Sequence, residues 1–288
     1  MDDSEPDLVD ANLAHAAGGY PGSQRARLPE EIVENEYNFN HPNRGYAIII
    51  NNRKFEHHTE MPERNGTDLD AAALYQRLSA LDFKVELVNN LRREEMRSKL
   101  EEVAKRNHSD NDCVVVAILT HGEEGVVYGV DGWIELEKLV APFKGDKCLT
   151  LVGKPKIFFV QACRGNKLDH GVEVCDAEVV KDEPDAATVF RVPSEADFLM
   201  AYSVVPGYFS WRNSTNGSWF IQSLCKVLEK FGHTLDIMTM MTRVNRMVAF
   251  DYESNANKEY MSKKKQIPCI TSMLTKDLYF RPKLPGRH

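Results

Sequence analysis

The sequence predicts an α/β fold in which a predominantly parallel sheet of six strands lies between helices on both faces. Short apolar runs recur along the chain, and the run at 114–119 (VVVAIL) contains no polar residue. Segments with apolar residues at helical spacing separate these runs. A chain of 288 residues that is 42% hydrophobic can bury a large core, so we expect a single domain.

The strands are expected where apolar runs have the length of a buried strand. Continuous apolar runs, rather than alternating ones, are typical of parallel strands that are covered on both faces. Each run has a length typical of a strand. The six expected strands are 46–50, 83–87, 114–119, 157–160, 198–202 and 270–274.

Four helices are expected to cover the sheet. Thr67 and Asp70 have the spacing of a capping box at the start of the first helix, whose inner face carries Leu74, Leu78 and Leu81. We interpret the methionine-rich stripe of the fourth helix as core packing. The apolar positions of the other three are Met96, Leu100 and Val103; Phe220, Leu224, Val227, Leu228 and Phe231; and Ile237, Met240, Met241, Val244 and Val248.

Two segments lack such patterns. Residues 1–40 are rich in Gly, Pro, Asp and Ala with weak periodicity, and we expect them to be disordered. The segment at 167–194 breaks the alternation of strands and helices and contains several acidic residues, so it is expected to be a long loop or linker.

Composition argues against two kinds of partner. A net charge of -7 leaves no basic face for a phosphate backbone, so no nucleic-acid partner is expected. The acidic start (MDDSEPD) lacks the basic residues of a signal peptide, and no apolar run approaches the length of a membrane span. We therefore expect a soluble intracellular protein without a membrane partner.

The cysteines do not have the spacing of a metal site. The six residues, at 113, 148, 163, 175, 225 and 269, include no pair closer than 12 positions (163 and 175). This spacing fits neither a zinc site nor a compact disulfide framework. We expect reduced thiols, and neither a metal nor an organic cofactor.

Two strand ends carry residues suited to nucleophilic catalysis. Cys163 follows the run at 157–160, and His121 follows the run at 114–119. Ligand sites form at the carboxyl ends of parallel strands, so both side chains can face one substrate. A thiol needs a neighbouring imidazole or comparable help to become a nucleophile near neutral pH. The pair predicts a cysteine nucleophile and a proton carrier, and the N–H groups of Gly122 and Cys163 are candidates for an oxyanion hole.

Six short motifs follow one another in a characteristic order. They are 64–68 (RNGTD), 121–122 (HG), 161–165 (QACRG), 206–212 (PGYFSWR), 217–220 (GSWF) and 265–269 (KQIPC). The cysteine motif with an upstream histidine is a known caspase signature. From about residue 38 to 280 the chain resembles the executioner branch of the caspase family. The resemblance implies a caspase-like fold and a cysteine endopeptidase that cuts after aspartate in Asp-Glu-x-Asp-like sequences during apoptosis.

The resemblance also assigns the site residues. Arginine suits a buried substrate carboxylate because its planar fork binds both oxygens. The Pro62 carbonyl is expected to orient His121, and the backbone of Ser210 and Arg212 is expected to pair with an extended peptide. The implied pocket for the aspartate side chain is formed by Arg64, Gln161 and Arg212, the next pocket by Phe209 and Trp211, and the fourth by Asn213 and Trp219.

One loop departs from the family pattern. Executioner caspases often place aromatic residues near the outer pockets, and this chain has Asn255, Asn257 and Met261 there. The sequence therefore leaves open which residues are preferred at the fourth and fifth substrate positions.

The resemblance further implies a zymogen that works as a homodimer of large and small subunits in the cytoplasm, and also in the nucleus. The expected parts are a short prodomain at 1–40, a large subunit at 41–176, a cleavable linker at 177–194 and a small subunit at 195–288. An upstream initiator caspase is expected to cut after Asp176, and the enzyme itself after Asp185; Asp10 is a further candidate. Protein inhibitors of apoptosis are possible partners.

Two alternatives are open to the same fold. A relative that cuts after lysine or arginine would carry acidic residues where Arg64 and Arg212 stand. A catalytically dead adaptor would typically lack the cysteine or the histidine, and this chain keeps both Cys163 and His121.

Overall fold

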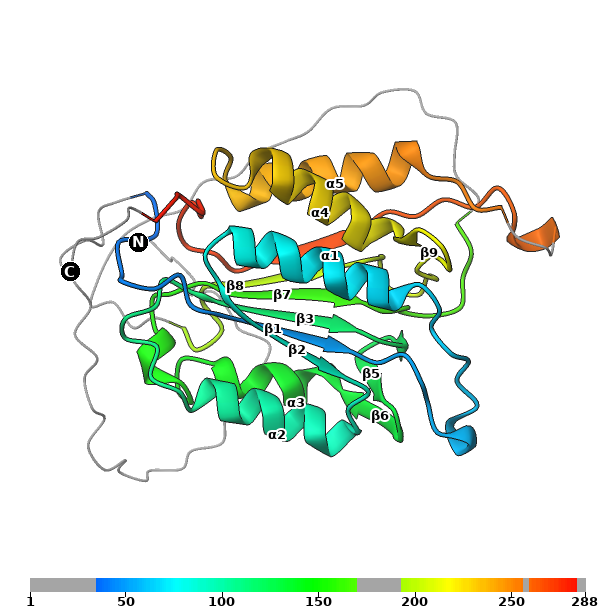
Figure 1. The fold of residues 1–288 in the computed structure, drawn as a ribbon, viewed down its shortest axis with the longest axis horizontal. Coiled ribbons are helices and arrows are strands. Elements are labelled where there is room, and N and C mark those ends of the chain that lie inside the picture. Colours follow the sequence, from blue (N-terminus) through cyan, green and yellow to red (C-terminus); the bar gives the residue numbers. More distant parts are fainter. Residues whose placement is uncertain (1–34, 170–192, 256–258, 284–288) are drawn as a thin grey trace, which may run out of the picture.

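A central sheet of six strands dominates the structure (Figure 1), a computed structural model that describes residues 35–169, 193–255 and 259–283. The strand order is β11-β8-β7-β3-β1-β2, and every neighbouring pair is parallel except β11 with β8. This confirms the predicted fold class. The strands are β1 (Tyr46–Asn51), β2 (Lys84–Asn89), β3 (Val114–Leu119), β7 (Lys156–Gln161), β8 (Phe198–Tyr202) and β11 (Cys269–Ser272).

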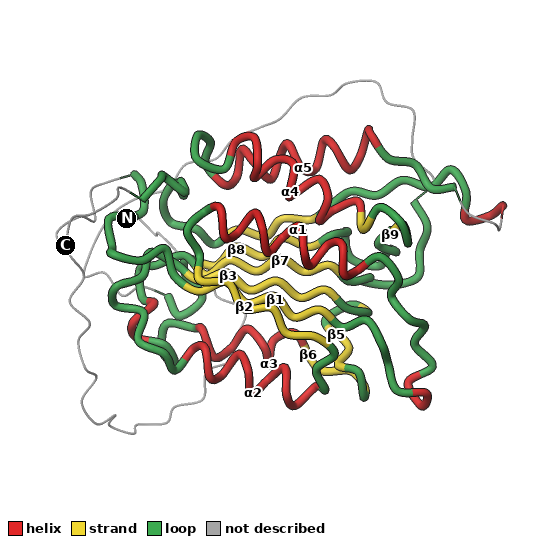
Figure 2. Tube along the Cα trace, in the orientation of Figure 1, coloured by secondary structure: helices red, strands yellow, loops and turns green. Residues whose placement is uncertain are grey.

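Helices cover both faces of the sheet, as Figures 1 and 2 show. α1, α4 and α5 lie on one face, and α2 and α3 lie on the other. The predicted stripe on α5 is fully buried, which confirms that its methionines belong to the core. No helix in the described ranges is long and apolar enough to cross a membrane. The helices are α1 (Thr67–Ala80), α2 (Arg93–Ala104), α3 (Leu136–Val140), α4 (Trp219–Phe231) and α5 (Ile237–Asp251).

The predicted capping box of α1 is wrong. The residue before the helix is Gly66, which makes no side-chain cap, and the Asp70 carboxylate faces a distant segment instead. It accepts hydrogen bonds from the Ser218 backbone N–H at 2.9 Å and from Gln222 Nε2 at 2.8 Å. The acidic side chain therefore joins α1 to the start of α4, where the buried Ser218 N–H needs an acceptor.

The predicted disorder of residues 1–40 is wrong for its last six positions. Tyr37 is buried, and its hydroxyl donates to Asp197 Oδ1 at 2.8 Å. The same carboxylate accepts from Thr275 Oγ1 at 2.7 Å and lies 3.9 Å from Lys156 Nζ. We call these four residues the Asp197 cluster. It ties the chain before β1 to the starts of β7 and β8, and residues 1–34 lie outside the described residues.

Two small sheets were not predicted. One contains β4 (Gly122–Glu123), β5 (Val126–Gly129) and β6 (Gly132–Glu135), and the other pairs β9 (Arg212–Asn213) with β10 (Gly217–Ser218). Strands of two to four residues are too short to produce a periodic pattern. β5, β6 and β9 are labelled at the right of Figure 1, where the parallel strands end. Gly122 belongs to the first of these small sheets and Arg212 to the second.

Candidate functional site

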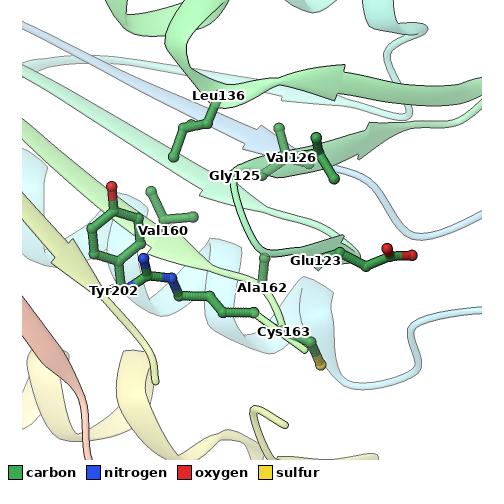
Figure 3. A pocket seen from close by; sticks show the side chains of 10 residues that line it. Glu123, Gly125, Val126, Leu136, Val160, Ala162, Cys163 and Tyr202 are labelled. Atoms are coloured by element: carbon green, nitrogen blue, oxygen red, sulfur yellow. The ribbon is translucent and has the colours of Figure 1, made fainter. Parts of the chain in front are cut away.

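His121 and Cys163 line one cavity at this edge of the sheet. His121 is two residues beyond β3, and Cys163 is two residues beyond β7, and these strands are neighbours. Figure 3 shows the Cys163 sulfur pointing away from the apolar side chains of Val160 and Leu136. The structure therefore places His121 and Cys163 at one cavity, as expected from their positions at the ends of neighbouring strands.

Gly122 allows the two strand ends to approach closely. A Cβ atom at this position would lie 2.9 Å from the Cys163 carbonyl oxygen and 2.9 Å from the Ala162 Cβ, closer than real Cβ atoms come. Glycine is thus required for the contact between this loop and the cysteine loop. The approach is compatible with an oxyanion hole made by the backbone of Gly122 and Cys163, which stays a prediction.

The His121 ring is held from two sides. Its Nε2 lies 2.8 Å from the Pro62 carbonyl oxygen, and its ring centroid lies 4.8 Å from that of Phe55. A carbonyl oxygen only accepts hydrogen bonds, so Nε2 carries the hydrogen in the neutral ring. Nδ1 is then the nitrogen that can accept a proton. The contact expected of Pro62 is present, and Phe55 is a neighbour that sequence reasoning missed.

Backbone groups of Ser210 contact the Cys163 sulfur. The Ser210 N–H donates to Sγ at 3.4 Å, and Sγ lies 3.9 Å from the Ser210 carbonyl oxygen. Ser210 also accepts a hydrogen bond from Gln161 Nε2 at its hydroxyl, at 2.7 Å. A peptide that pairs with the Ser210 backbone is therefore brought beside the nucleophile.

Burial sets the protonation of the pair. It lowers the pKa of His121 to about 4, although the Pro62 carbonyl contact acts in the opposite direction. It also raises the pKa of the Cys163 thiol, and the Ser210 N–H and the charges of Arg64 and Arg212 offset this only in part. Near neutral pH the resting pair is consequently a thiol and a neutral imidazole.

This protonation state predicts the pH dependence of alkylation by iodoacetamide. The thiolate is the reactive form, so a raised Cys163 pKa makes the rate increase by about tenfold per pH unit through the neutral range. Because His121 is already neutral above about pH 4, its titration does not change the alkylation rate in the neutral pH range. The rate at Cys163 is followed by peptide mass spectrometry, with Cys163→Ala identifying labelling of other cysteines. A rate that is flat from acidic to neutral pH, as for a thiolate–imidazolium pair, would contradict this state.

Arg64 is a buried cation with unused donors. Its side chain has 0% exposure, and Nη1 donates to the Asn52 carbonyl oxygen at 3.0 Å and to Thr67 Oγ1 at 2.8 Å. Nε and Nη2 are buried without a hydrogen-bond partner in the described structure. Burial and the nearby charge of Arg212 lower the Arg64 pKa to about 9. A buried guanidinium with free donors, near a second and partly exposed cation, is suited to bind an anion.

Arg212 and Gln161 are the other two residues expected in the aspartate pocket. Arg212 Nε donates to the Asn65 carbonyl oxygen at 2.9 Å, and both Arg212 and Gln161 line the cavity with Cys163. Gln161 Oε1 is buried without a partner. Of the three polar residues expected in the aspartate pocket, Gln161 and Arg212 thus line the cavity, and Arg64 is close enough to feel the charge of Arg212. Their role toward an aspartate stays a prediction.

Of the residues predicted for the outer pockets, two line the cavity and two do not. Phe209 and Trp211 line the cavity, as expected for a pocket beside the aspartate site. Trp219 is only 7% exposed because it stacks between Trp211 and Tyr252, with centroid distances of 5.8 and 5.4 Å. Asn213 accepts hydrogen bonds from its own turn, at Thr215 and Asn216. In this structure, Trp219 supports Trp211 rather than facing the cavity.

Two further residues of the site gave no signal of their role in the sequence. Gln266 is buried, accepts from the Trp211 N–H at 2.6 Å and donates to the Ser203 carbonyl oxygen at 2.6 Å. It therefore fixes the loop that carries Trp211. Met261 also lines the cavity, although the sequence showed it only as a difference from the aromatic residues that the family often has in this loop. The KQIPC motif was the one available sign of Gln266, without indicating its contacts.

Several predicted residues lie outside the described residues. These are the processing candidates Asp10, Asp176 and Asp185, together with Cys175 and Asn257. The other five cysteines are free thiols. Within the described ranges, no group of three or more His, Cys, Asp or Glu side chains could hold a metal ion.

Comparison with known proteins identifies relatives of this arrangement. Residues 44–279 match the family described as "Caspase domain". Caspase-7 of Gallus gallus is 50% identical over 247 residues, covering 85% of this chain and 80% of its own. Caspase-3 of Felis catus is 48% identical over 248 residues, covering 86% and 88%. The crystal structure of caspase-1 from Spodoptera frugiperda matches with a TM-score of 0.83 and 46% identity, covering 90% of this chain and 100% of that one.

Proposed function

The chain belongs to the caspase family and is a cysteine-type endopeptidase, and we propose that as an executioner caspase it cuts cellular proteins after aspartate. The observation that carries the proposal is the buried Arg64 guanidinium, whose Nε and Nη2 are unpaired and whose charge acts on Cys163. An aspartate carboxylate supplies the two acceptor oxygens and the negative charge that this group lacks.

The proposed reaction uses the Cys163 sulfur as nucleophile. As sulfur attacks the peptide carbonyl carbon, the thiol proton passes to His121 Nδ1, and the carbonyl oxygen becomes an anion that the Gly122 and Cys163 N–H groups stabilise. His121 then gives the proton to the leaving amine, and the C–N bond breaks. Water hydrolyses the resulting thioester, with His121 taking one proton from the water and returning it to sulfur.

The substrate is proposed to bind as an extended peptide. Backbone groups of Ser210 and Arg212 add it as a strand beside the cavity, and the apolar side chains of Phe209 and Trp211 contact the residue before the aspartate. Asn213 and Trp219 are proposed to shape the fourth pocket, the latter through Trp211. Asp-Glu-x-Asp-like sequences are the proposed targets.

Positional scanning with fluorogenic tetrapeptides tests this function. The expected profile has aspartate alone at the position before the cut, with broader choice at the second position, where the contacts are apolar. Comparison of wild type with Met261→Phe tests the outer cavity, because Met261 is the side chain of the divergent loop that lines it. Efficient cutting after lysine, arginine or glutamate would contradict the proposed pocket.

The alternative of a catalytically dead adaptor has no support. Both Cys163 and His121 are present and line the same cavity, and the histidine has its orienting carbonyl from Pro62. An adaptor would not need these groups to meet. The second alternative, cutting after basic residues, conflicts with the cations at this site, the buried Arg64 and the partly exposed Arg212.

The proposed enzyme is a zymogen with the parts 41–176 and 195–288 joined by the linker 177–194. We propose that it works as a homodimer in the cytoplasm and the nucleus, and that an initiator caspase and inhibitor proteins are its partners. Parallel pairing of β7 with β8 supports this division, because the two strands lie on opposite sides of the linker and hold each other in register.

Loss of Asp176 and Asp185 together is expected to block activation. Cleavage after Asp176 by an initiator caspase and after Asp185 by the enzyme itself would free the loops that carry Cys163 and Arg212 to settle around substrate. Wild type and an Asp176→Ala/Asp185→Ala variant are incubated with an initiator caspase and compared by intact-mass spectrometry and peptide turnover. Asp10→Ala, which removes the third candidate, is the control. Cleavage of the double variant between 163 and 198 with normal activation would contradict these sites.

A further inference from the structure

Only part of the Arg64 guanidinium is bound by the protein. A guanidinium carries five N–H donors in one plane. Nη1 has two of them, and these meet the Asn52 carbonyl oxygen at 3.0 Å and the Thr67 hydroxyl at 2.8 Å. The other donors, on Nε and Nη2, have no partner among the described residues. Because the group is planar, the two bonds at Nη1 fix the direction of the free donors.

The Thr67 hydroxyl can accept from Arg64 because Asn51 sets its orientation. Thr67 Oγ1 donates to Asn51 Oδ1 at 2.7 Å. Asn51 Nδ2 in turn donates to the Asp68 carboxylate at 2.8 Å, and a carboxylate only accepts, so the amide oxygen must face Thr67. The hydroxyl hydrogen therefore points to Asn51, and the oxygen lone pairs are left for Arg64.

These groups are buried and belong to rigid elements. Thr67 is the first residue of α1 and is 0% exposed, and Asn51 is the last residue of β1 and is 1% exposed. Asn51 Nδ2 also bonds to Asn89 Oδ1 at 3.0 Å, across the paired ends of β1 and β2. Thr67 and Asn51 are shielded from water, so their polar groups depend on the protein for partners, whereas Asp68 and Asn89 at the outer end of the network are exposed.

We propose that Thr67, oriented by Asn51, is the positioning residue that aims the Arg64 guanidinium at the substrate aspartate. The inference rests on the proposed function, since it assigns a role toward the same pocket. It predicts that specificity depends on a hydroxyl group that does not touch the substrate. A side chain of the same shape without the hydroxyl would leave one Nη1 N–H of Arg64 without an acceptor. The guanidinium would then rotate toward a different acceptor and no longer hold its present orientation.

The test compares three threonine variants. Thr67→Val keeps the shape and removes the hydroxyl, whereas Thr67→Ser keeps the hydroxyl. Thr275→Val removes a hydroxyl that donates to a buried carboxylate, Asp197, at the opposite edge of the sheet, and so serves as the matched control. kcat and KM are measured for peptides with aspartate or glutamate before the cut, and melting temperatures are measured alongside.

The expected loss for Thr67→Val is about 10- to 100-fold in kcat/KM for the aspartate peptide, the range for removing a hydrogen bond to a charged group. We expect kcat/KM for the glutamate peptide to fall less, because its longer side chain does not fit the fixed direction of the Arg64 donors. The ratio of kcat/KM for aspartate to kcat/KM for glutamate therefore falls. Thr67→Ser is expected to restore most of the ratio, and Thr275→Val is expected to keep it. If Thr67→Val does not fold, Thr67→Ala gives the same comparison without an added methyl group.

Two results would overturn the inference while leaving the proposed function standing. In the first, Thr67→Val has the same ratio of kcat/KM for the aspartate peptide to kcat/KM for the glutamate peptide as the wild type has. The other is an equal loss for both peptides that Thr67→Ser fails to restore, which is what a purely structural role would produce. A wild-type enzyme without aspartate preference would instead overturn the proposed function, and this inference with it.

Discussion

Replacing Cys163 with alanine is expected to abolish peptide hydrolysis without unfolding the protein. The side chain is the single thiol that lines the cavity of the described structure, so no other sulfur can form the bond to the substrate carbonyl. Losing the nucleophile should cost more than about 10⁴-fold in kcat. The residue is small and half-buried, so we expect the free energy of unfolding to change by less than about 1 kcal/mol. Turnover of a fluorogenic aspartyl peptide and thermal denaturation measure both quantities.

His121→Ala is the companion variant. Positioned acid–base groups contribute roughly 10²- to 10⁴-fold, so its loss should be large but smaller than that of Cys163→Ala. His108→Ala serves as a control for loss of a buried histidine, because His108 bonds to the Val103 carbonyl oxygen, outside the cavity. A folded Cys163→Ala protein with appreciable turnover would refute the proposed mechanism.

Changing the substrate aspartate to asparagine is expected to lower kcat/KM on the order of 10⁴-fold. Sites that use buried polar groups to bind a substrate reject an analogue that leaves those groups unpaired by about this factor. Here the unpaired group would be the Arg64 guanidinium, which is fully buried and near a second cation, Arg212. The amide supplies one acceptor oxygen and no charge, so it replaces the carboxylate poorly.

The measurement compares matched aspartyl and asparaginyl peptides on wild type, Arg64→Ala and Arg212→Ala. Each variant should lose most of its activity on the aspartyl peptide, and the difference between the two peptides should shrink. Arg243→Ala is a suitable control, since the guanidinium of this α5 residue lies over the ring of Phe231, the last residue of α4. Tolerance of asparagine within tenfold by the wild type would rule out an arginine-based pocket.

Strands were predictable to the extent that they are buried on both faces. β3 and β8 have the predicted bounds, because every residue of β3 and nearly every residue of β8 is buried and apolar. β2 runs from Lys84 to Asn89, later than the predicted 83–87, because it is an edge strand with alternating exposure. β11, also at an edge, ends at Ser272 rather than 274. Partial exposure weakens the apolar pattern that marks a strand.

Local patterns failed where the partner is distant in sequence. Asp70 has the spacing of a cap, but Ser218 and Gln222 use its carboxylate. Tyr37 lies in a segment of low periodicity, yet it is ordered because Asp197 accepts its hydroxyl hydrogen. Neither partner can be read from neighbouring residues, since each contact forms only after the sheet has brought its two sides together.

The candidate site was predictable at the strand ends and in the family motifs. Cys163 and His121 followed from the rule that parallel strands place ligand sites at their carboxyl ends. Arg64, Gln161 and Arg212 followed from the resemblance. Phe55 and Gln266 act through contacts with His121 and Trp211, and a single aromatic or amide residue gives no sequence signal for such contacts.

The Asp197 cluster has a consequence for a protein that is cut between 170 and 192. Tyr37 and Lys156 precede the cut, whereas Asp197 and Thr275 follow it, so contacts within one chain become contacts between two. The intact chain can refold at any dilution, but the cut protein must first reunite its fragments, which depends on concentration. Cleavage thus makes the folded state harder to regain once lost. A cut enzyme diluted and denatured would stay inactive where the uncut chain recovers its fold.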